Sequence, residues 1–198
     1  MPDAHPGAAE AQARLSAAEE LLPRCDTLVD AAELRSIYDR LAAAAAADLR
    51  GLHPLVICVM SGGLYATSEI TQRWDFAFDL DYLQATRYRG QTSGGEILWK
   101  AVPGRSLAGR HVLVIDDVLD EGHTLVAVLE ALRGQQPASL RTLVTCEKVH
   151  DHKHPEAAAD YAGVQLPDRY LFGAGMDYHE AWRQLDHIVA LPEKEDGH

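Results

Sequence analysis

The sequence has few cysteines and few basic residues. Only three of its 198 residues are cysteines, Cys25, Cys58 and Cys146, and they are widely spaced. They provide no disulfide framework and no zinc-binding spacing, so we expect reduced, buried thiols. Lysine and arginine number 18 against 30 aspartates and glutamates, a net charge of −12. This deficit of positive charge disfavours nucleic acid or an anionic membrane surface as a partner.

Long apolar segments are also missing. No apolar run approaches the ~20 residues that span a bilayer. The first ten residues are polar, carry Asp3 and Glu10, and lack the basic start and apolar core of a signal peptide. We therefore expect no membrane association and a cytoplasmic location. The composition, 47% hydrophobic and 24% charged, is typical of a globular protein.

Short apolar runs alternate with helical patterns beyond residue 50. Buried strands are expected at Leu55–Met60, His111–Ile115 and Leu140–Val149, and helices at 64–73 and 124–133. This order predicts a βαβ arrangement, in an α/β domain whose mostly parallel, twisted sheet is flanked by helices. The expected parts are a flexible tail (1–10), a single domain (11–198) with N-terminal helices (11–50, the second from about Asp26 to Leu49), an extended excursion (76–102) and a C-terminal part (150–198).

The segment Val112–Leu125 carries the clearest chemistry. Its apolar strand ends at Asp116 and Asp117, a short loop with Asp120 and Gly122 follows, and a helix begins near Thr124. Ligands of open α/β sheets bind at the carboxyl ends of strands, and helix N-termini favour phosphate. Carboxylates can accept hydrogen bonds from sugar hydroxyls or hold Mg²⁺. The combination favours a sugar phosphate as ligand.

This segment resembles the signature of the type I phosphoribosyltransferases, which bind phosphoribosyl pyrophosphate (PRPP). The resemblance implies that Asp116 and Asp117 contact the ribose hydroxyls and a Mg²⁺ ion, and that Asp120 is the catalytic residue beside the purine nitrogen. The residues implied to bind the ribose phosphate are Asp116, Asp117, Asp120, Glu121, Gly122, His123 and Thr124. Glu121 departs from the family pattern, so its backbone N–H rather than its side chain would bind phosphate.

Two further segments resemble family loops. Ser61-Gly62-Gly63 is similar to the pyrophosphate loop of the 6-oxopurine enzymes, although Ser61 stands where lysine is common. Arg87 and Tyr88 begin a Gly/Ser/Thr-rich stretch that is partly similar to the mobile loop that closes over the family's active site. Closure would exclude the water that hydrolyses PRPP.

Residues 166–183 contain Pro167-Asp168, then Tyr170, Gly173 and Asp177-Tyr178-His179-Glu180. In this spacing the C-terminal part resembles hypoxanthine-guanine phosphoribosyltransferases and would form a hood that binds the base. The resemblance implies that Lys148 donates to the exocyclic oxygen of a 6-oxopurine, Tyr170 stacks on its ring and the Leu171 main chain contacts its edge. It also implies that Asp177 helps to hold Mg²⁺ and that Arg183 contacts pyrophosphate. An ammonium group cannot accept a hydrogen bond from the amino group of adenine, which disfavours that base.

The implied reaction converts a purine base and PRPP into a nucleotide and pyrophosphate. Asp120 is a candidate general base for the purine ring proton, and its rival role is electrostatic stabilisation of the sugar cation. Two alternatives remain: a transferase for xanthine or another base, and a regulator that senses PRPP or a nucleotide. Family analogy suggests a homodimer or homotetramer.

Three histidines alternate along residues 150–154. His150, His152 and His154 could share one face of a strand and bind a metal. The neighbouring Lys153 and Pro155 favour a solvated loop, which is our expectation here.

Overall fold

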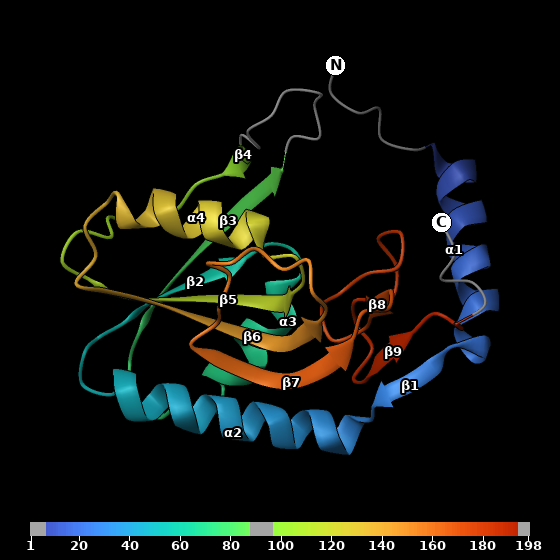
Figure 1. The fold of residues 1–198 in the computed structure, drawn as a ribbon, viewed down its shortest axis with the longest axis horizontal. Helices are drawn as coiled ribbons and strands as arrows, with labels where there is room; N and C mark the ends of the chain where they lie inside the picture. The colour runs from blue at the N-terminus through green and yellow to red at the C-terminus, as the bar shows by residue number, and fades with distance from the viewer. Residues whose placement is uncertain (1–6, 88–96, 194–198) are drawn as a thin grey trace.

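The computed structural model describes residues 7–87 and 97–193 of the chain (Figure 1). The helices are α1 (Ala8–Leu21), α2 (Ala31–Leu49), α3 (Gly63–Thr71) and α4 (His123–Arg133), with a 3₁₀ turn at Leu22–Arg24. The strands are β1 (Asp26–Val29), β2 (Leu55–Val59), β3 (Asp79–Arg87), β4 (Ile97–Ala101), β5 (His111–Leu119), β6 (Ser139–Val149), β7 (Tyr161–Pro167), β8 (Leu171–Phe172) and β9 (Ile188–Ala190).

A six-stranded sheet forms the centre, in the order β4-β3-β2-β5-β6-β7. All neighbouring pairs are parallel except β3 and β4, which are antiparallel. The carboxyl ends of β2, β5, β6 and β7 therefore lie at one edge of the sheet, on the right in Figure 1. This confirms the expected α/β domain and fixes the edge where ligands of such sheets bind.

Helices cover both faces of this sheet because its central strands are apolar on both sides. On β5, Val112 and Val114 pack in a cluster with α4, whereas Leu113 and Ile115 pack in a cluster with α2 and α3. Such alternation is expected of a strand buried on both faces. The two clusters hold the central strands, and hence the loops that follow them, in fixed positions.

The N-terminal part differs from expectation. Helix α1 begins at Ala8, inside the segment expected to be a flexible tail, and α2 begins at Ala31 rather than near Asp26. Residues 26–29 instead form β1, which pairs with β9. Asp30 caps α2 by accepting hydrogen bonds from the backbone N–H groups of Ala32 (2.8 Å) and Glu33 (2.9 Å), which sets the start of that helix.

Strand β5 is also longer than predicted. It continues through Asp116 and Asp117 to Leu119 because β6 runs beside it, pairing Asp116 with Val144 and Leu119 with Glu147. The acidic pair therefore lies within the strand instead of breaking it. The loop that is expected to bind phosphate begins only after Leu119.

A second, antiparallel sheet stands beside the carboxyl ends of the main strands, in the order β1-β9-β8 (Figure 1). Two of its strands, β8 and β9, come from residues 150–198, the segment expected to form a base-binding hood, and the third, β1, comes from the N-terminal part. We call this sheet, together with residues 170–190, the hood. Among residues 7–87 and 97–193, no helix is long and apolar enough to cross a membrane.

Candidate active site

Glycines allow the loop after β2 to approach the acidic pair. A Cβ at Gly62 would lie 2.0 Å from Asp117 Oδ2, and one at Gly63 would lie 2.4 Å from the Ile115 carbonyl oxygen. Gly175 of the hood, with a φ of +106°, meets the same loop, since its Cβ would lie 2.1 Å from the Gly62 oxygen. Three distant segments thus touch at one point. The preceding Met60–Ser61 peptide is cis, and Ser61 is exposed.

The acidic pair is held by its own backbone. Asp116 Oδ1 accepts a hydrogen bond from the Asp117 N–H (2.9 Å), and Asp117 Oδ1 accepts one from the Val118 N–H (2.7 Å). Asp117 is buried at 9% exposure and Asp116 is partly exposed. Burial raises the pKa of both carboxyls, the charge of Asp117 raises that of Asp116 further, and Arg183 partly offsets the rise at Asp117. The pair therefore favours a cationic neighbour.

The N-terminus of α4 is open to an anion. Gly122 has a φ of +80°, and a Cβ there would lie 2.2 Å from Ala157 Cβ, so only glycine fits. No side chain caps the helix, and the first N–H groups of an α-helix have no intrahelical partner. The Glu121 side chain is exposed, with Oε2 4.0 Å from His123 Nε2.

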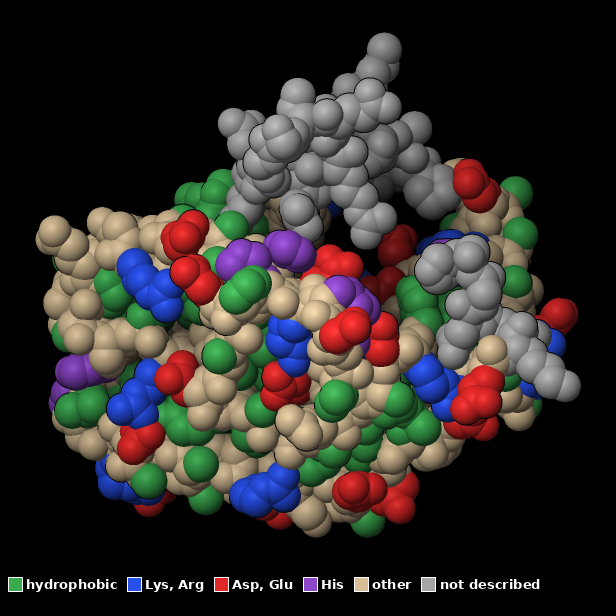
Figure 2. Space-filling model, viewed as in Figure 1, with side chains coloured by type: hydrophobic (Ala, Val, Ile, Leu, Met, Phe, Trp, Pro, Cys, Tyr) green, Lys and Arg blue, Asp and Glu red, His purple; other side chains and the backbone are tan. Residues whose placement is uncertain are grey.

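Lys148, at the end of β6, bridges two carboxylates. Its Nζ lies 2.8 Å from Asp120 Oδ2 and 3.5 Å from Asp168 Oδ1, and its side chain is only 13% exposed. The other oxygen of Asp120 accepts a hydrogen bond from His150 Nε2 at 3.1 Å. Both oxygens of the candidate catalytic carboxylate are therefore oriented. Figure 2 shows acidic side chains at a hollow in this face, with histidines at its rim.

The hood brings together its own aromatic, acidic and basic residues. Arg183 Nη2 lies 2.6 Å from Asp177 Oδ1, and its Nη1 donates to the Gly175 carbonyl oxygen at 2.8 Å. Asp177 Oδ2 also accepts from the Glu180 N–H at 2.6 Å. Tyr170 is 42% exposed and donates through its hydroxyl to the Asp177 carbonyl oxygen at 3.2 Å. Arg183 thus holds the turn at Gly175, and Gly175 in turn meets the Gly62 loop.

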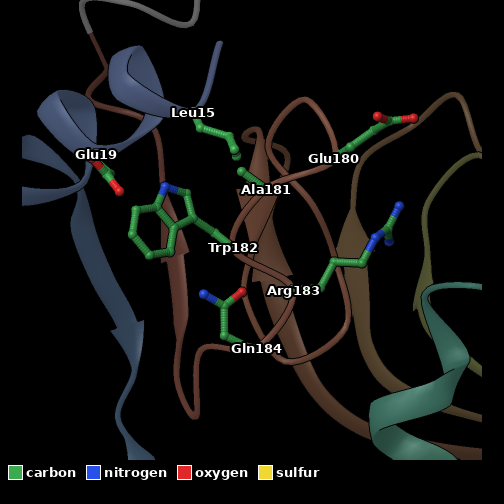
Figure 3. Close-up of a pocket in the computed structure, with 7 residues that line it drawn as sticks. All are labelled: Leu15, Glu19, Glu180, Ala181, Trp182, Arg183 and Gln184. Atoms are coloured by element: carbon green, nitrogen blue, oxygen red, sulfur yellow. The ribbon is translucent and has the colours of Figure 1, made fainter. Parts of the chain in front are cut away.

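A cavity of about 280 Å³ lies behind this arrangement, between α1 and residues 180–184 (Figure 3). Trp182 extends towards α1 and donates from Nε1 to the Ala18 carbonyl oxygen at 2.9 Å. Arg183 extends to the opposite side. These two adjacent residues therefore point in opposite directions. Trp182 anchors α1, and Arg183 lies on the side of the acidic pair.

Residues 25–181 match the family described as the phosphoribosyl transferase domain. The chain belongs to the phosphoribosyltransferase family.

Individual relatives agree with this assignment. The hypoxanthine-guanine-xanthine phosphoribosyltransferase of Tritrichomonas foetus is 33% identical over 71% of this chain and 77% of its own. The hypoxanthine-guanine phosphoribosyltransferase of Streptococcus pneumoniae is 28% identical over 84% of this chain and 93% of its own. A hypoxanthine phosphoribosyltransferase structure from Staphylococcus aureus superposes with a TM-score of 0.81 at 26% identity, covering 87% of this chain and 94% of that one.

The fold of this phosphoribosyltransferase brings most of the expected site residues to one edge of the main sheet. The loop at Gly62 and Gly63 touches the acidic pair, and Asp120 pairs with Lys148. Leu171 is buried in β8, where it pairs with Ala190. Arg87 ends β3, whereas Tyr88 lies outside the described residues.

Sequence reasoning missed two residues of this arrangement. His150 was expected in a solvated loop, but its side chain is only 4% exposed and contacts Asp120. Its position directly after the Lys148 strand end was the available signal. Gly175 gave no local signal, because its contact with Gly62 joins segments more than a hundred residues apart.

Proposed function

We propose that this protein transfers the phosphoribosyl group of PRPP to hypoxanthine or guanine in purine salvage, forming IMP or GMP and pyrophosphate. One observation carries the choice of base: Lys148 Nζ pairs at 2.8 Å with Asp120, which lies two residues before Gly122, the uncapped start of α4. An ammonium donor matches the exocyclic oxygen of a 6-oxopurine, and the adjacent helix N-terminus matches the 5′-phosphate of PRPP. The names of the relatives point to the same bases.

Each chain segment has a proposed task in binding. The backbone of residues 121–124 binds the 5′-phosphate, and the carboxylates of Asp116 and Asp117 accept from the ribose hydroxyls. Ser61-Gly62-Gly63 and Arg183 bind pyrophosphate, Tyr170 stacks on the purine and the Leu171 main chain contacts its edge. These contacts would align the purine nitrogen with the anomeric carbon, which lowers the entropic part of the barrier.

Asp120 would act on the ring nitrogen that attacks the sugar. As a general base it takes the proton that this nitrogen loses when the N-glycosidic bond forms and pyrophosphate leaves. As an electrostatic group it stabilises the positive charge of the oxocarbenium-like sugar. Replacement by Asn removes both effects. A solvent deuterium isotope effect on the transfer step separates them, because only the general base moves a proton in the transition state.

Phosphoribosyltransferases generally use Mg²⁺ with PRPP. The Asp116, Asp117 and Asp177 side chains fit such an ion, because they offer only carboxylate oxygens, the donors that Mg²⁺ prefers. Asp177 already accepts from Arg183 and the Glu180 N–H, so it would reach the ion through water. When bound, Mg²⁺ supplies neutralisation of the charge on the departing pyrophosphate.

Nucleotide formation from PRPP and Mg²⁺ with hypoxanthine, guanine, xanthine, adenine and uracil tests the proposal. We expect turnover of hypoxanthine or guanine, and its loss in Lys148→Ala and Asp120→Asn. Turnover of xanthine alone would favour the second base assignment, which the Tritrichomonas relative's name keeps open. Binding of PRPP without turnover of any base would contradict the enzyme and favour a sensor.

We also propose a cytoplasmic homo-oligomer. Four large apolar side chains on and beside β3 and β4 are more than half exposed: Leu80, Tyr82, Leu98 and Val102. Exposed apolar groups of this size are typical of protein–protein contacts. Light scattering coupled to gel filtration is expected to give a dimer or tetramer, and a monomer at all concentrations would contradict it.

A further inference from the structure

Three side chains beside the Lys148–Asp120 pair form a cluster of metal-ligand type. His150 and His152 follow β6, and Asp168 follows β7. One ring nitrogen of each histidine and one carboxylate oxygen of Asp168 all lie within 4.8 Å of one another. We call these residues the His–Asp cluster. None of the three has a task in the binding of PRPP or base proposed above.

His150 is oriented as histidine metal ligands usually are. Its Nε2 donates to Asp120 Oδ1 at 3.1 Å, so the neutral ring carries a lone pair on Nδ1. That Nδ1 is buried and has no hydrogen-bond partner among the described residues, in a side chain only 4% exposed. Metal-binding histidines commonly donate their second nitrogen to a carboxylate, which fixes the ring. The cluster therefore contains a buried ring nitrogen without a partner among the described residues, which indicates a missing ligand.

The other two members of the cluster are free to adjust. The His152 side chain is 52% exposed and the Asp168 side chain 41%, and His152 Nε2 lies 3.7 Å from Asp168 Oδ2. The His152 ring stacks on His150 with 3.8 Å between centroids and 17° between planes. The nitrogen lone pairs of stacked rings lie in nearly parallel planes, so His152 must turn to share an ion with His150. Its exposure permits this, and ligand atoms around tetrahedral zinc stand about 3.3 Å apart.

The geometry points to a binding site for a divalent transition metal, represented by Zn²⁺, at His150, His152 and Asp168. Two imidazoles and one carboxylate suit zinc, nickel or cobalt, whereas the oxygen-only set at Asp116 and Asp117 suits Mg²⁺. Water completes the coordination. The neutral tautomer of His150, which donates from Nε2 to Asp120, binds the ion without losing a proton, and a protonated histidine releases one to solvent.

Occupation of this site is coupled to Lys148. Asp168 Oδ1 lies 3.5 Å from Lys148 Nζ, so an ion on Asp168 takes one of the two carboxylates that hold the ammonium and adds a positive charge beside it. We expect Zn²⁺ to weaken purine binding and to leave PRPP binding unchanged. This consequence rests on the proposed function, whereas binding of the ion does not.

Calorimetric titration with Zn²⁺ alone tests the site, on protein without a histidine tag and in excess Mg²⁺ to occupy the carboxylate pair. We expect one ion per chain in the wild type, and affinity at least about tenfold weaker in His152→Ala and Asp168→Asn. The matched control is His154→Ala on the same loop, whose ring packs edge-on against His123 at 5.1 Å, outside the cluster. Its affinity should equal that of the wild type.

Two further readouts make the result decisive. Co²⁺ in place of Zn²⁺ should give visible absorption bands of a tetrahedral site, absent in His152→Ala. The purine KM should rise with Zn²⁺ in the wild type and in His154→Ala, but not in His152→Ala, whose activity without Zn²⁺ stays unchanged. Wild-type affinity in His152→Ala, loss of affinity only in His154→Ala, or no zinc binding by the wild type would each overturn the proposal. Calorimetry reads these outcomes whether or not the protein transfers phosphoribosyl groups.

Discussion

At the scale of single residues, the candidate site depends on two carboxyl groups whose ionised form is disfavoured by burial. Asp116 and Asp117 lie side by side inside β5, where burial raises the pKa of both carboxyls. A carboxyl whose pKa is raised by folding destabilises the folded protein wherever it is ionised. Such a cost in stability is expected at a site that binds a cation and a sugar, because the carboxylates that bind them are not the residues that would stabilise the fold most.

We predict that Asp116→Asn stabilises the ligand-free protein at neutral pH. The wild-type penalty is absent below the unfolded-state pKa of the carboxyl and complete above its folded-state pKa. The gain in unfolding free energy should therefore be largest at neutral pH and disappear as the pH falls towards 4, about the reference value for Asp. Denaturant unfolding at several pH values measures this. A gain of equal size at every pH would contradict the role of ionisation.

We predict that Gly62→Ala disables the site more than it destabilises the fold. The new Cβ would lie 2.0 Å from Asp117 Oδ2, so the loop must move away from the acidic pair. Displacements of about 1 Å can cost roughly a hundredfold in rate, whereas overpacking costs about 1–3 kcal/mol of stability. Steady-state kinetics and thermal unfolding measure both effects. Gly104→Ala is the control, because the nearest atom to its Cβ is 3.9 Å away.

At the scale of elements, the ends of the helices are set by single side chains or by backbone geometry. Asp30 caps α2, whose buried stripe of Leu34, Ile37, Tyr38 and Leu41 supports the main sheet. At α4 the first turn has no side-chain cap, and Gly122 supplies the turn. Asp30 thus satisfies two N-terminal N–H donors of α2. Helix α4, at the candidate site, keeps its N-terminal N–H donors for a ligand.

We predict that Asp30→Ala lowers the unfolding free energy by about 1 kcal/mol, the usual value of an N-cap. Turnover at moderate temperature should stay unchanged, because the Asp30 side chain bonds to the first turn of α2 and none of its hydrogen bonds within the described residues reaches a proposed site residue. Chemical denaturation measures the loss. Asp30→Asn keeps an acceptor for the Ala32 and Glu33 N–H groups and should behave as the wild type. Equal losses in both variants would assign the effect to charge rather than capping.

At the scale of the whole molecule, the N-terminal part of the chain supports the hood. Strand β1 pairs with β9, and α1 is tied to residues 179–182 by Arg14 and by the Trp182 hydrogen bond to Ala18. Arg183 follows directly and binds Gly175 and Asp177. The N-terminal part therefore supports the segment that carries Arg183, the residue that we propose binds pyrophosphate.

We predict that Trp182→Phe loosens α1. The variant keeps an aromatic ring but loses the donor to the Ala18 carbonyl oxygen, a change of about 1 kcal/mol. Amide hydrogen exchange should become faster in residues 8–21. Trp74→Phe is the matched control, because it removes an equivalent donor to the Ala42 carbonyl oxygen, at 3.0 Å, from a different part of the molecule. Its exchange in α1 should match the wild type.

The sequence by itself determined the parts whose causes are local. The apolar runs of β2, β5 and β6, the acids in the carboxyl-terminal half of β5 and the glycine before α4 follow from burial on two faces, turn geometry and helix ends. Family resemblance added the expected tasks of these residues. Local patterns and family motifs can both be recognised from residues that are neighbours in the chain.

Only the tertiary structure decided what depends on distant pairing. The pairing of β1 with β9, the extension of β5 along β6, the contact of Gly175 with Gly62 and the burial of His150 against Asp120 all join segments far apart in the chain. Local patterns carry no signal of such pairs, because their stability comes from surfaces that meet only when the sheet is complete. The cluster beside Lys148 is of this kind, because the pairing of β6 with β7 brings its two histidines to Asp168.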